Sequence, residues 1–278
     1  MTTRRASILP SGGLAQKCRR LTWRVRPLPD FIVIGAQKSG TSSLFAYLSQ
    51  HPELTPSFGK GVHFFDGGRE VGVDNYRRGE AWYRAQFPIA GNSPNARAFE
   101  ASPLYIFHPL VPSRMHKLLP HVKIIALLRN PTERAISHYF HERRKDREPL
   151  QIMQALAAEE ERLAPILRDE DYGNPSFRSY SYKSRGHYAE QLSRYLACFS
   201  REQILVLSSE HLFLQPSETL RAVFEFVDVD PDQEISDLRA RNVGSRSGVG
   251  PDVRRYLDEH FSSPNAALYE LIGARLGW

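Results

Sequence analysis

Nine residues near the start of the chain have the types and spacing of a phosphate-binding loop. They read G-A-Q-K-S-G-T-S-S, from Gly35 to Ser43. Glycines at a turn from strand to helix let backbone N–H groups close around an anion, and the new helix adds the positive end of its dipole. A nucleoside-triphosphate loop reads G-x-x-x-x-G-K-[ST], but here Thr41 follows Gly40 and the lysine is Lys38, inside the loop. The loop predicts a bound phosphate, and its displaced lysine argues against an ordinary kinase or ATPase.

A second polar pair predicts a second phosphate group. Arg129 follows the apolar run 123–128, and Ser137 lies eight residues later. If a helix begins near Pro131, Ser137 lies about two turns into it, at roughly 3.6 residues per turn, and can face back over the strand end. An arginine fork and a hydroxyl that converge on one point suit a phosphate. Together with Lys38 they describe a ligand with two phosphate groups.

The elements that must position these residues alternate along the chain. Short apolar runs rich in β-branched residues predict strands buried on both faces, at 31–35 (FIVIG), 123–128 (KIIALL) and 203–207 (QILVL). Helical spacing follows each run, at 42–50, 131–145 and 220–227. We therefore expect a single α/β domain with a central, mainly parallel sheet flanked by helices and a nucleotide site like that of P-loop NTPases. Residues 71–84 and 169–185 are predicted to be surface loops, and we expect them to determine which second ligand, the acceptor of the transferred group, is bound.

The positive charge of the chain is concentrated at its start. Residues 1–29 contain seven Lys/Arg and no acid, whereas residues 30–278 contain 30 basic and 31 acidic residues, a net charge of −1. We interpret 1–29 as a basic, flexible tail and 30–278 as the folded domain, whose near-neutral charge argues against nucleic-acid binding. The charged run 141–147 is predicted to be a solvated helix end.

Cysteine content and hydropathy predict a cytoplasmic protein. The chain has only Cys18 and Cys198, which argues against a disulfide framework and a cysteine metal site. No stretch approaches the ~20 apolar residues of a membrane span, and no secretory h-region is present. We therefore expect a reducing compartment, no transmembrane segment and no bound metal.

Five ordered segments resemble the sulfotransferases that use 3′-phosphoadenosine 5′-phosphosulfate (PAPS), in particular the heparan-sulfate-type branch and its bacterial relatives. The likeness runs from about residue 30 to Trp278. We expect the Trp278 side chain to serve as a packing anchor. The segments are 31–54, 60–66, 100–105, 124–139 and 185–192.

The resemblance implies a donor and a set of site residues. The 5′-phosphosulfate would lie on the first loop, with Lys38 meeting the bridging oxygen, where sulfuryl transfer builds negative charge much as phosphoryl transfer does. Arg129 and Ser137 would hold the 3′-phosphate. The expected cofactor-binding residues are Gly35, Gln37, Lys38, Ser39, Gly40, Thr41, Ser42, Ser43, Arg129, Ser137, Arg185 and Gly186. Lys60, His63 and Phe64 would contact the acceptor, a hydroxyl or amine on a carbohydrate or small molecule.

One position departs from the family pattern. The heparan-sulfate-type branch typically reads K-E-x-H-F-F-D at 60–66, and its Glu is the usual base, but this chain has Gly61. Loss of a general base commonly costs about 10²–10⁴-fold in rate. In one hypothesis His63 takes the proton, since an unperturbed imidazole titrates near pH 6.5. In another, Glu100 or Asp66 does so. In a third, the chain is a weakened enzyme or a nucleotide-binding pseudoenzyme. A P-loop kinase is the remaining, less favoured reading.

Overall fold

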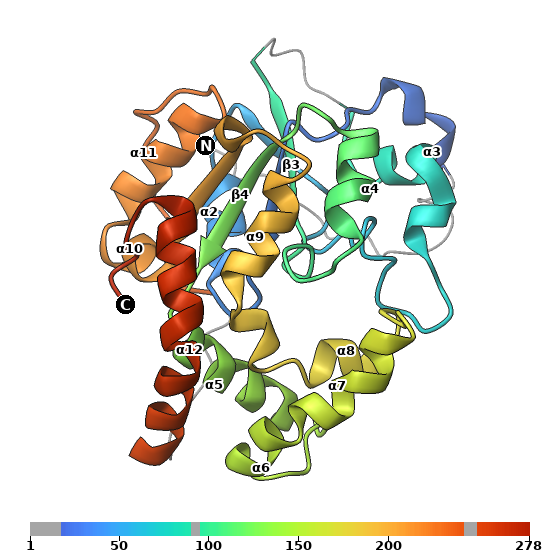
Figure 1. Cartoon of the computed structure of the whole chain (residues 1–278). Helices are drawn as coiled ribbons and strands as arrows, with labels where there is room; N and C mark the ends of the chain where they lie inside the picture. Colours follow the sequence, from blue (N-terminus) through green and yellow to red (C-terminus); the bar gives the residue numbers. More distant parts are fainter. Residues whose placement is uncertain (1–17, 90–94, 242–248) are drawn as a thin grey trace.

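A five-stranded parallel sheet forms the centre of the molecule (Figure 1). The structure is a computed structural model that describes residues 18–89, 95–241 and 249–278. The strand order is β2-β3-β1-β4-β5. The strands are β1 (Phe31–Gly35), β2 (Leu54–Pro56), β3 (Arg97–Ala101), β4 (Lys123–Leu128) and β5 (Ile204–Ser208). The predicted parallel sheet is therefore confirmed, and the runs 31–35 and 123–128 are strands over their full predicted length.

Alternating side chains of the central strands supply the two faces of the sheet. Phe31 and Val33 enter one buried cluster, whereas Ile32 and Ile34 enter another, because successive side chains of a strand point to opposite faces. All five residues of β1 are buried, as expected for a strand that is covered on both sides.

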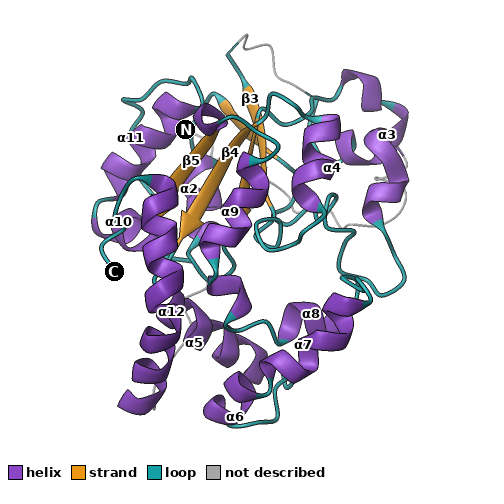
Figure 2. Ribbon diagram, viewed as in Figure 1, coloured by secondary structure: helices purple, strands orange, loops and turns teal. Residues whose placement is uncertain are grey.

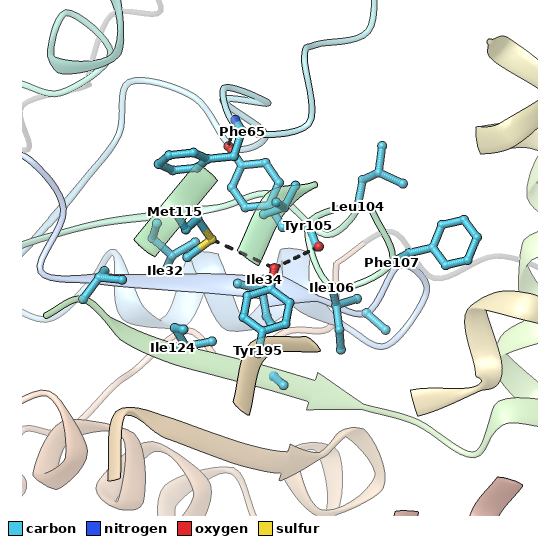
Figure 3. Packing of buried hydrophobic residues seen from close by; sticks show 14 of the residues in the cluster. Ile32, Ile34, Phe65, Leu104, Tyr105, Ile106, Phe107, Met115, Ile124 and Tyr195 are labelled. Atoms are coloured by element: carbon cyan, nitrogen blue, oxygen red, sulfur yellow. Dashed lines mark hydrogen bonds between the residues drawn. The ribbon is translucent and has the colours of Figure 1, made fainter. Parts of the chain in front are cut away.

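Helices cover both faces (Figure 2). On the face of Phe31 lie α2 (Thr41–Leu48), α10 (Ser209–Leu214) and α11 (Pro216–Phe226). On the face of Ile32 lie α3 (Gly79–Arg84), α4 (Val111–Leu118), α9 (Tyr188–Leu196) and the second half of α12 (Pro251–Ile272). The same cluster extends past the ends of the strands to α7 (Glu159–Arg168) and α8 (Pro175–Ser179). In this second cluster the Tyr195 hydroxyl donates to the Tyr105 carbonyl at 2.9 Å and lies beside the Met115 sulfur (Figure 3).

A third cluster holds the elements beyond the carboxyl ends of the strands. It joins α5 (Pro131–Arg143), α6 (Ile152–Ala157) and the first half of α12 around Tyr139, Tyr182 and Phe261. α5 begins at a defined point, because Pro131 occupies its first turn and the Asn130 side chain accepts a hydrogen bond from the Glu133 N–H at 3.2 Å. This cluster fixes how α5 leaves β4.

The prediction of a surface loop at 169–185 is wrong. The segment contains α8 and the 3-10 turn η3 (Ser184–Gly186), and it buries Phe177, Tyr182 and Arg185. Elements of three to five residues are shorter than two helical turns, so they leave no readable periodicity. The segment 71–84 likewise contains the 3-10 turn η2 (Asn75–Arg78) and α3.

The predicted tail at 1–29 is described only from residue 18. Here a 3-10 turn, η1 (Trp23–Val25), precedes Arg26, which is buried and donates to the Phe87 carbonyl at 2.6 Å. The boundary at residue 29 stays a prediction, and residues 1–17 lie outside the described residues. Across the described ranges, every helix is too short or too polar to cross a membrane.

Candidate functional site

A cavity of about 880 Å³ lies where β1 and β4 end. These two strands are neighbours at the centre of the sheet. β2 and β3 lie on one side of β1, and β4 and β5 lie on the other, so the strand order reverses at β1. Open parallel sheets bind ligands at such a position, outside the carboxyl ends of the strands. Of the residues predicted to bind cofactor or acceptor, the walls include Gln37, Lys38, Gly40, Thr41, Ser42, Lys60, His63, Arg129, Ser137 and Arg185.

The first loop joins β1 to α2 and faces the cavity. Gly40 has φ = +91°, and a Cβ there would lie 2.9 Å from ring atoms of Phe213, so a larger residue would be strained and crowded. Gly35, Ser39 and Ser43 belong to the loop but are not on the cavity wall. Gly35 serves packing, because a Cβ there would lie 2.4 Å from Ile106 Cγ2.

Arg129 and Ser137 both reach the cavity, as their spacing predicted. The Arg129 guanidinium donates to the Lys38 carbonyl at 3.2 Å and so ties the end of β4 to the first loop. Ser137 lies on α5, six residues after its first residue, Pro131. These side chains give the cavity a hydroxyl and a fork of N–H donors, which suits a phosphate group.

Arg185 links the site to the segment 169–185, which contains α8. Its side chain is buried, donates to the Gln37 side chain and lies over the Phe107 ring, with 5.0 Å from Cζ to the ring centroid. Burial, together with the charge of Arg134, lowers the pKa of Arg185 to about 9. Gly186 is not on the cavity wall; a Cβ there would lie 2.5 Å from the Phe261 ring.

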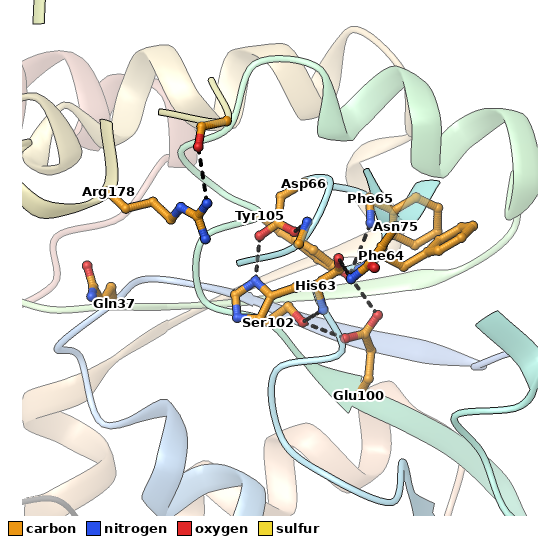
Figure 4. A network of polar contacts seen from close by, with 12 residues as sticks. Gln37, His63, Phe64, Phe65, Asp66, Asn75, Glu100, Ser102, Tyr105 and Arg178 are labelled. Carbon is orange, nitrogen blue, oxygen red and sulfur yellow. Dashed lines mark hydrogen bonds and ion pairs between the residues drawn. The ribbon is translucent and has the colours of Figure 1, made fainter. Parts of the chain in front are cut away.

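His63 is held in one orientation by Asp66 (Figure 4). Its Nδ1 lies 2.6 Å from Asp66 Oδ2, and both side chains are buried. The other ring nitrogen, Nε2, is buried and has no hydrogen-bond partner among the described residues, and other atoms of His63 contribute to the cavity wall. Because the carboxylate favours a proton on Nδ1, Nε2 is left with a lone pair that can accept a proton.

The backbone of His63 is also held on both sides. Its φ is +51°, in the left-handed region. The Ser102 hydroxyl accepts from the His63 N–H at 3.1 Å, and the Asn75 amide donates to the His63 carbonyl at 3.0 Å (Figure 4). These contacts stabilise a conformation that non-glycine residues adopt rarely.

Glu100 lies behind this network and not on the cavity wall. It is fully buried at the end of β3 and accepts hydrogen bonds from the Tyr83 hydroxyl at 2.7 Å, Ser102 at 2.6 Å and Tyr105 at 3.1 Å. Burial raises the pKa of Glu100 to about 7, although the three hydroxyl donors oppose this rise. Phe64 is also buried away from the cavity, stacked on Tyr83 with 4.4 Å between ring centroids. Glu100 and Phe64 thus support the segment of His63.

Gly61 and His63 compete for the same space. Gly61 has φ = +81°, and a Cβ there would lie 3.1 Å from His63 Nε2 and 3.2 Å from its Cδ2. The imidazole would therefore have to move by a few tenths of an ångström to admit a side chain at position 61. Next to it, burial and the charges of Arg69 and Lys38 lower the pKa of Lys60 to about 8.

Several cavity residues were missed from the sequence. They include Arg69, His141, Glu142, Arg144, Lys145, Arg147, Arg178, Glu210, Phe213 and Arg241. The prediction of a solvated helix end holds for 143–147, which are exposed. Residues of this run also line the cavity, because the end of α5 and the turn after it extend past Ser137. The density of basic residues in that run was the available signal. Among described residues, no group of three or more His, Cys, Asp or Glu side chains could hold a metal ion.

The cationic walls, the glycine-lined loop and the unpartnered His63 Nε2 fit a sulfonated nucleotide with two phosphate groups and an acceptor beside it. Residues 28–243 match the family model described as "Sulfotransferase domain". The bifunctional heparan sulfate N-deacetylase/N-sulfotransferase 2 of Bos taurus is 30% identical over 90% of this chain, and the corresponding bifunctional enzyme of Drosophila melanogaster is 31% identical over 88%. The chain spans only 30% and 26% of the lengths of these two relatives. A crystal structure of a sulfotransferase from Alicyclobacillus acidocaldarius is 34% identical, with a TM-score of 0.74, and the likeness covers 90% of this chain and 98% of that one.

Proposed function

The chain belongs to the sulfotransferase family, which uses PAPS as sulfuryl donor, and from this premise we propose that it sulfates a hydroxyl or amine of an acidic carbohydrate, with His63 as the general base. The observation that carries this proposal is the His63–Asp66 pair. Its buried Nδ1 contact of 2.6 Å fixes the tautomer, and its Nε2 has no partner among the described side chains.

The roles of the other residues follow from charge. Bound PAPS supplies the sulfuryl group and a phosphate leaving group. Lys38 lines the cavity within the first loop and would stabilise the negative charge that builds on the leaving oxygen. Arg129 and Ser137 would bind the 3′-phosphate, and Gln37, Gly40, Thr41, Ser42 and Arg185 would complete the nucleotide site.

Proton transfer needs a base next to the acceptor. His63 Nε2 would accept the proton of the acceptor O–H or N–H as the bond to sulfur forms, and Asp66 would stabilise the imidazolium. Glu100, the other predicted base, is separated from the cavity by burial and is engaged by three hydroxyls, so we assign it to positioning Ser102 and through it the His63 N–H.

The charge of the cavity supports an acidic acceptor. Ten Lys or Arg side chains and two Glu side chains line it. The two phosphate groups of the donor account for only part of this positive charge. Arg147 pairs with Glu142 at 2.6 Å, and Arg69, Lys145 and Arg178 would contact the acceptor. The named activity of the bifunctional relatives is N-sulfation of heparan sulfate, which is consistent with an amine acceptor here.

A catalytically silent nucleotide-binding protein is the second candidate, favoured by Gly61 in place of the expected glutamate. The His63–Asp66 pair argues for an enzyme, because it offers a base in the space next to Gly61. A cytoplasmic location stays a prediction, which fractionation of the source cells would test.

Calorimetry with 3′-phosphoadenosine 5′-phosphate (PAP), AMP and ATP tests the donor site. We expect PAP to bind more tightly than AMP or ATP, and Arg129→Ala to weaken PAP binding with little effect on AMP. Tight ATP binding with no PAP binding would overturn the proposal. Transfer of labelled sulfate from PAPS to N-desulfated heparin then distinguishes an enzyme from a silent nucleotide-binding protein.

A further inference from the structure

The segment after α12, residues 273–278, contacts a residue of the cavity wall through the Trp278 side chain. Trp278 Nε1 donates to Glu210 Oε2 at 3.1 Å, and Glu210 contributes to the cavity wall. The Trp278 ring packs near the rings of Tyr269 and Tyr188, with centroid distances of 5.8 Å and 6.3 Å. Trp278 is therefore more than the packing anchor that the sequence predicted, because it also orients an acid on the cavity wall.

Glu210 and Tyr188 hold the backbone on the two sides of one peptide bond. The Asn130 N–H donates to Glu210 Oε1 at 3.0 Å, and the Tyr188 hydroxyl donates to the Arg129 carbonyl at 3.0 Å. Both polar atoms of the Arg129–Asn130 peptide are thus engaged by side chains from α10 and α9. Burial raises the pKa of Tyr188 to about 12, so its hydroxyl keeps the donated proton at neutral pH.

This peptide stands where β4 ends and α5 begins, so its orientation sets the direction of the Arg129 side chain. An acid on the wall of an anion site would ordinarily weaken anion binding. Glu210 is instead committed by both of its oxygens, since the Asn130 N–H donates to Oε1, while Trp278 Nε1 and the Ser208 hydroxyl donate to Oε2. Its contacts identify it as part of the support for Arg129.

We propose that Trp278, Glu210 and Tyr188 are positioning residues that fix the Arg129–Asn130 peptide and thereby the preference of this site for a nucleotide with a second phosphate group. The inference rests on the proposed function, in which Arg129 binds that phosphate. In this proposal three separate elements share a role in donor selection. They are α9, α10 and the segment after α12.

The test measures the dissociation constants of PAP and AMP by calorimetry for the full chain and its variants. Trp278→Phe keeps a ring but removes the N–H donor, and Tyr188→Phe removes only the hydroxyl. Each variant should weaken PAP binding about three- to tenfold, the effect of losing one hydrogen bond, and leave AMP binding nearly unchanged. Glu210→Ala should reduce the PAP/AMP preference at least as much.

Tyr269→Phe is the matched control, because it also removes a hydroxyl from a ring beside Trp278, and that hydroxyl is buried with no partner among the described residues. It should leave the preference unchanged. A wild-type chain that binds PAP no more tightly than AMP would overturn both the proposed function and this inference. A selective wild-type chain whose Trp278→Phe and Tyr188→Phe variants keep its PAP/AMP ratio would overturn this inference alone. Equal weakening of PAP and AMP would also overturn it, since that result indicates general damage to the fold.

Discussion

At the scale of residues, the contact between His63 and Asp66 carries the proposed proton transfer from the acceptor. The buried 2.6 Å interaction leaves Nε2 as the nitrogen that can take a proton. We expect His63→Ala to lower kcat about 10²–10⁴-fold, the usual contribution of a general base, with PAP affinity retained. Sulfate transfer assays and calorimetry check the two halves of this prediction. Activity that survives His63→Ala would place the base elsewhere.

Gly61 occupies the position at which the resemblance to heparan-sulfate-type sulfotransferases predicts a glutamate. A Cβ at this position would meet His63 Nε2 at 3.1 Å and would require a left-handed backbone conformation, at about 1–2 kcal/mol for an L-residue. We therefore expect Gly61→Glu to lower the transfer rate by displacing the imidazole. Gly59→Ala is the control, since a Cβ there meets no atom within 4 Å. A rate increase of about 10²-fold in Gly61→Glu would show that the glutamate is the better base in this site.

Glu100 gives the fold a specific dependence on pH. Its folded-state pKa is raised from 4.5 to about 7, so between these values the native state keeps a proton that the unfolded chain has released. The contribution of Glu100 to stability is therefore largest below pH 4.5 and falls as pH rises through 7, by up to about 3 kcal/mol.

Urea unfolding of the wild type and Glu100→Gln at several pH values isolates this effect. The difference in unfolding free energy, wild type minus variant, should decrease between pH 5 and pH 8. A difference that stays constant over this range would contradict a raised pKa.

At the scale of elements, the site depends on how η3, α5 and α12 meet. Gly186 lies at that meeting point, where a Cβ would be 2.5 Å from the Phe261 ring and 3.0 Å from Pro131 Cβ. Gly186→Ala should lower the free energy of unfolding by about 1–3 kcal/mol through overpacking, and should weaken PAP binding by moving the neighbouring Arg185.

Urea denaturation and PAP calorimetry measure the two effects of Gly186→Ala. The control is Gly250→Ala at the start of α12, where a Cβ meets no atom within 4 Å. If both variants show similar small changes in unfolding free energy and PAP affinity, the contact between η3, α5 and α12 accommodates the extra methyl group, which would contradict the prediction.

At the scale of the whole molecule, positive charge is concentrated on the wall of one cavity. Residues 30–278 have a net charge of −1, yet ten Lys or Arg side chains line one cavity with two Glu. Such a field attracts anionic ligands and weakens as salt screens it. A near-neutral total therefore coexists with a strongly cationic site.

Binding of heparin should accordingly weaken as NaCl concentration rises. The double variant Arg69→Ala/Lys145→Ala should lower the affinity and reduce the slope against salt, because both side chains line the cavity. Lys117→Ala/Arg255→Ala removes the same charge from exposed positions outside the cavity and should leave the slope unchanged. Equal effects of the two double variants would indicate that heparin binds by overall charge and not in the cavity.

The sequence was sufficient where a local pattern sets the structure. The β-branched runs at 31–35 and 123–128 predicted two central strands, and the glycine spacing of 35–43 predicted the loop between β1 and α2. β2, with three residues, and α8, with five, are too short to leave a periodic signal, so sequence patterns do not predict the first and place the second in a loop.

By itself the sequence determined the α/β class, the turn from β1 to α2 and the placement of Arg129 and Ser137 on one cavity, because backbone propensity and helical spacing act between residues close in the chain. Only the tertiary structure decided that His63 faces the cavity while Glu100 is buried, that Gly61 leaves room for the imidazole, and that the run 141–147 lines the site. These outcomes depend on packing between segments distant in sequence, where volume, burial and electrostatics select one arrangement among side chains whose types alone allow several.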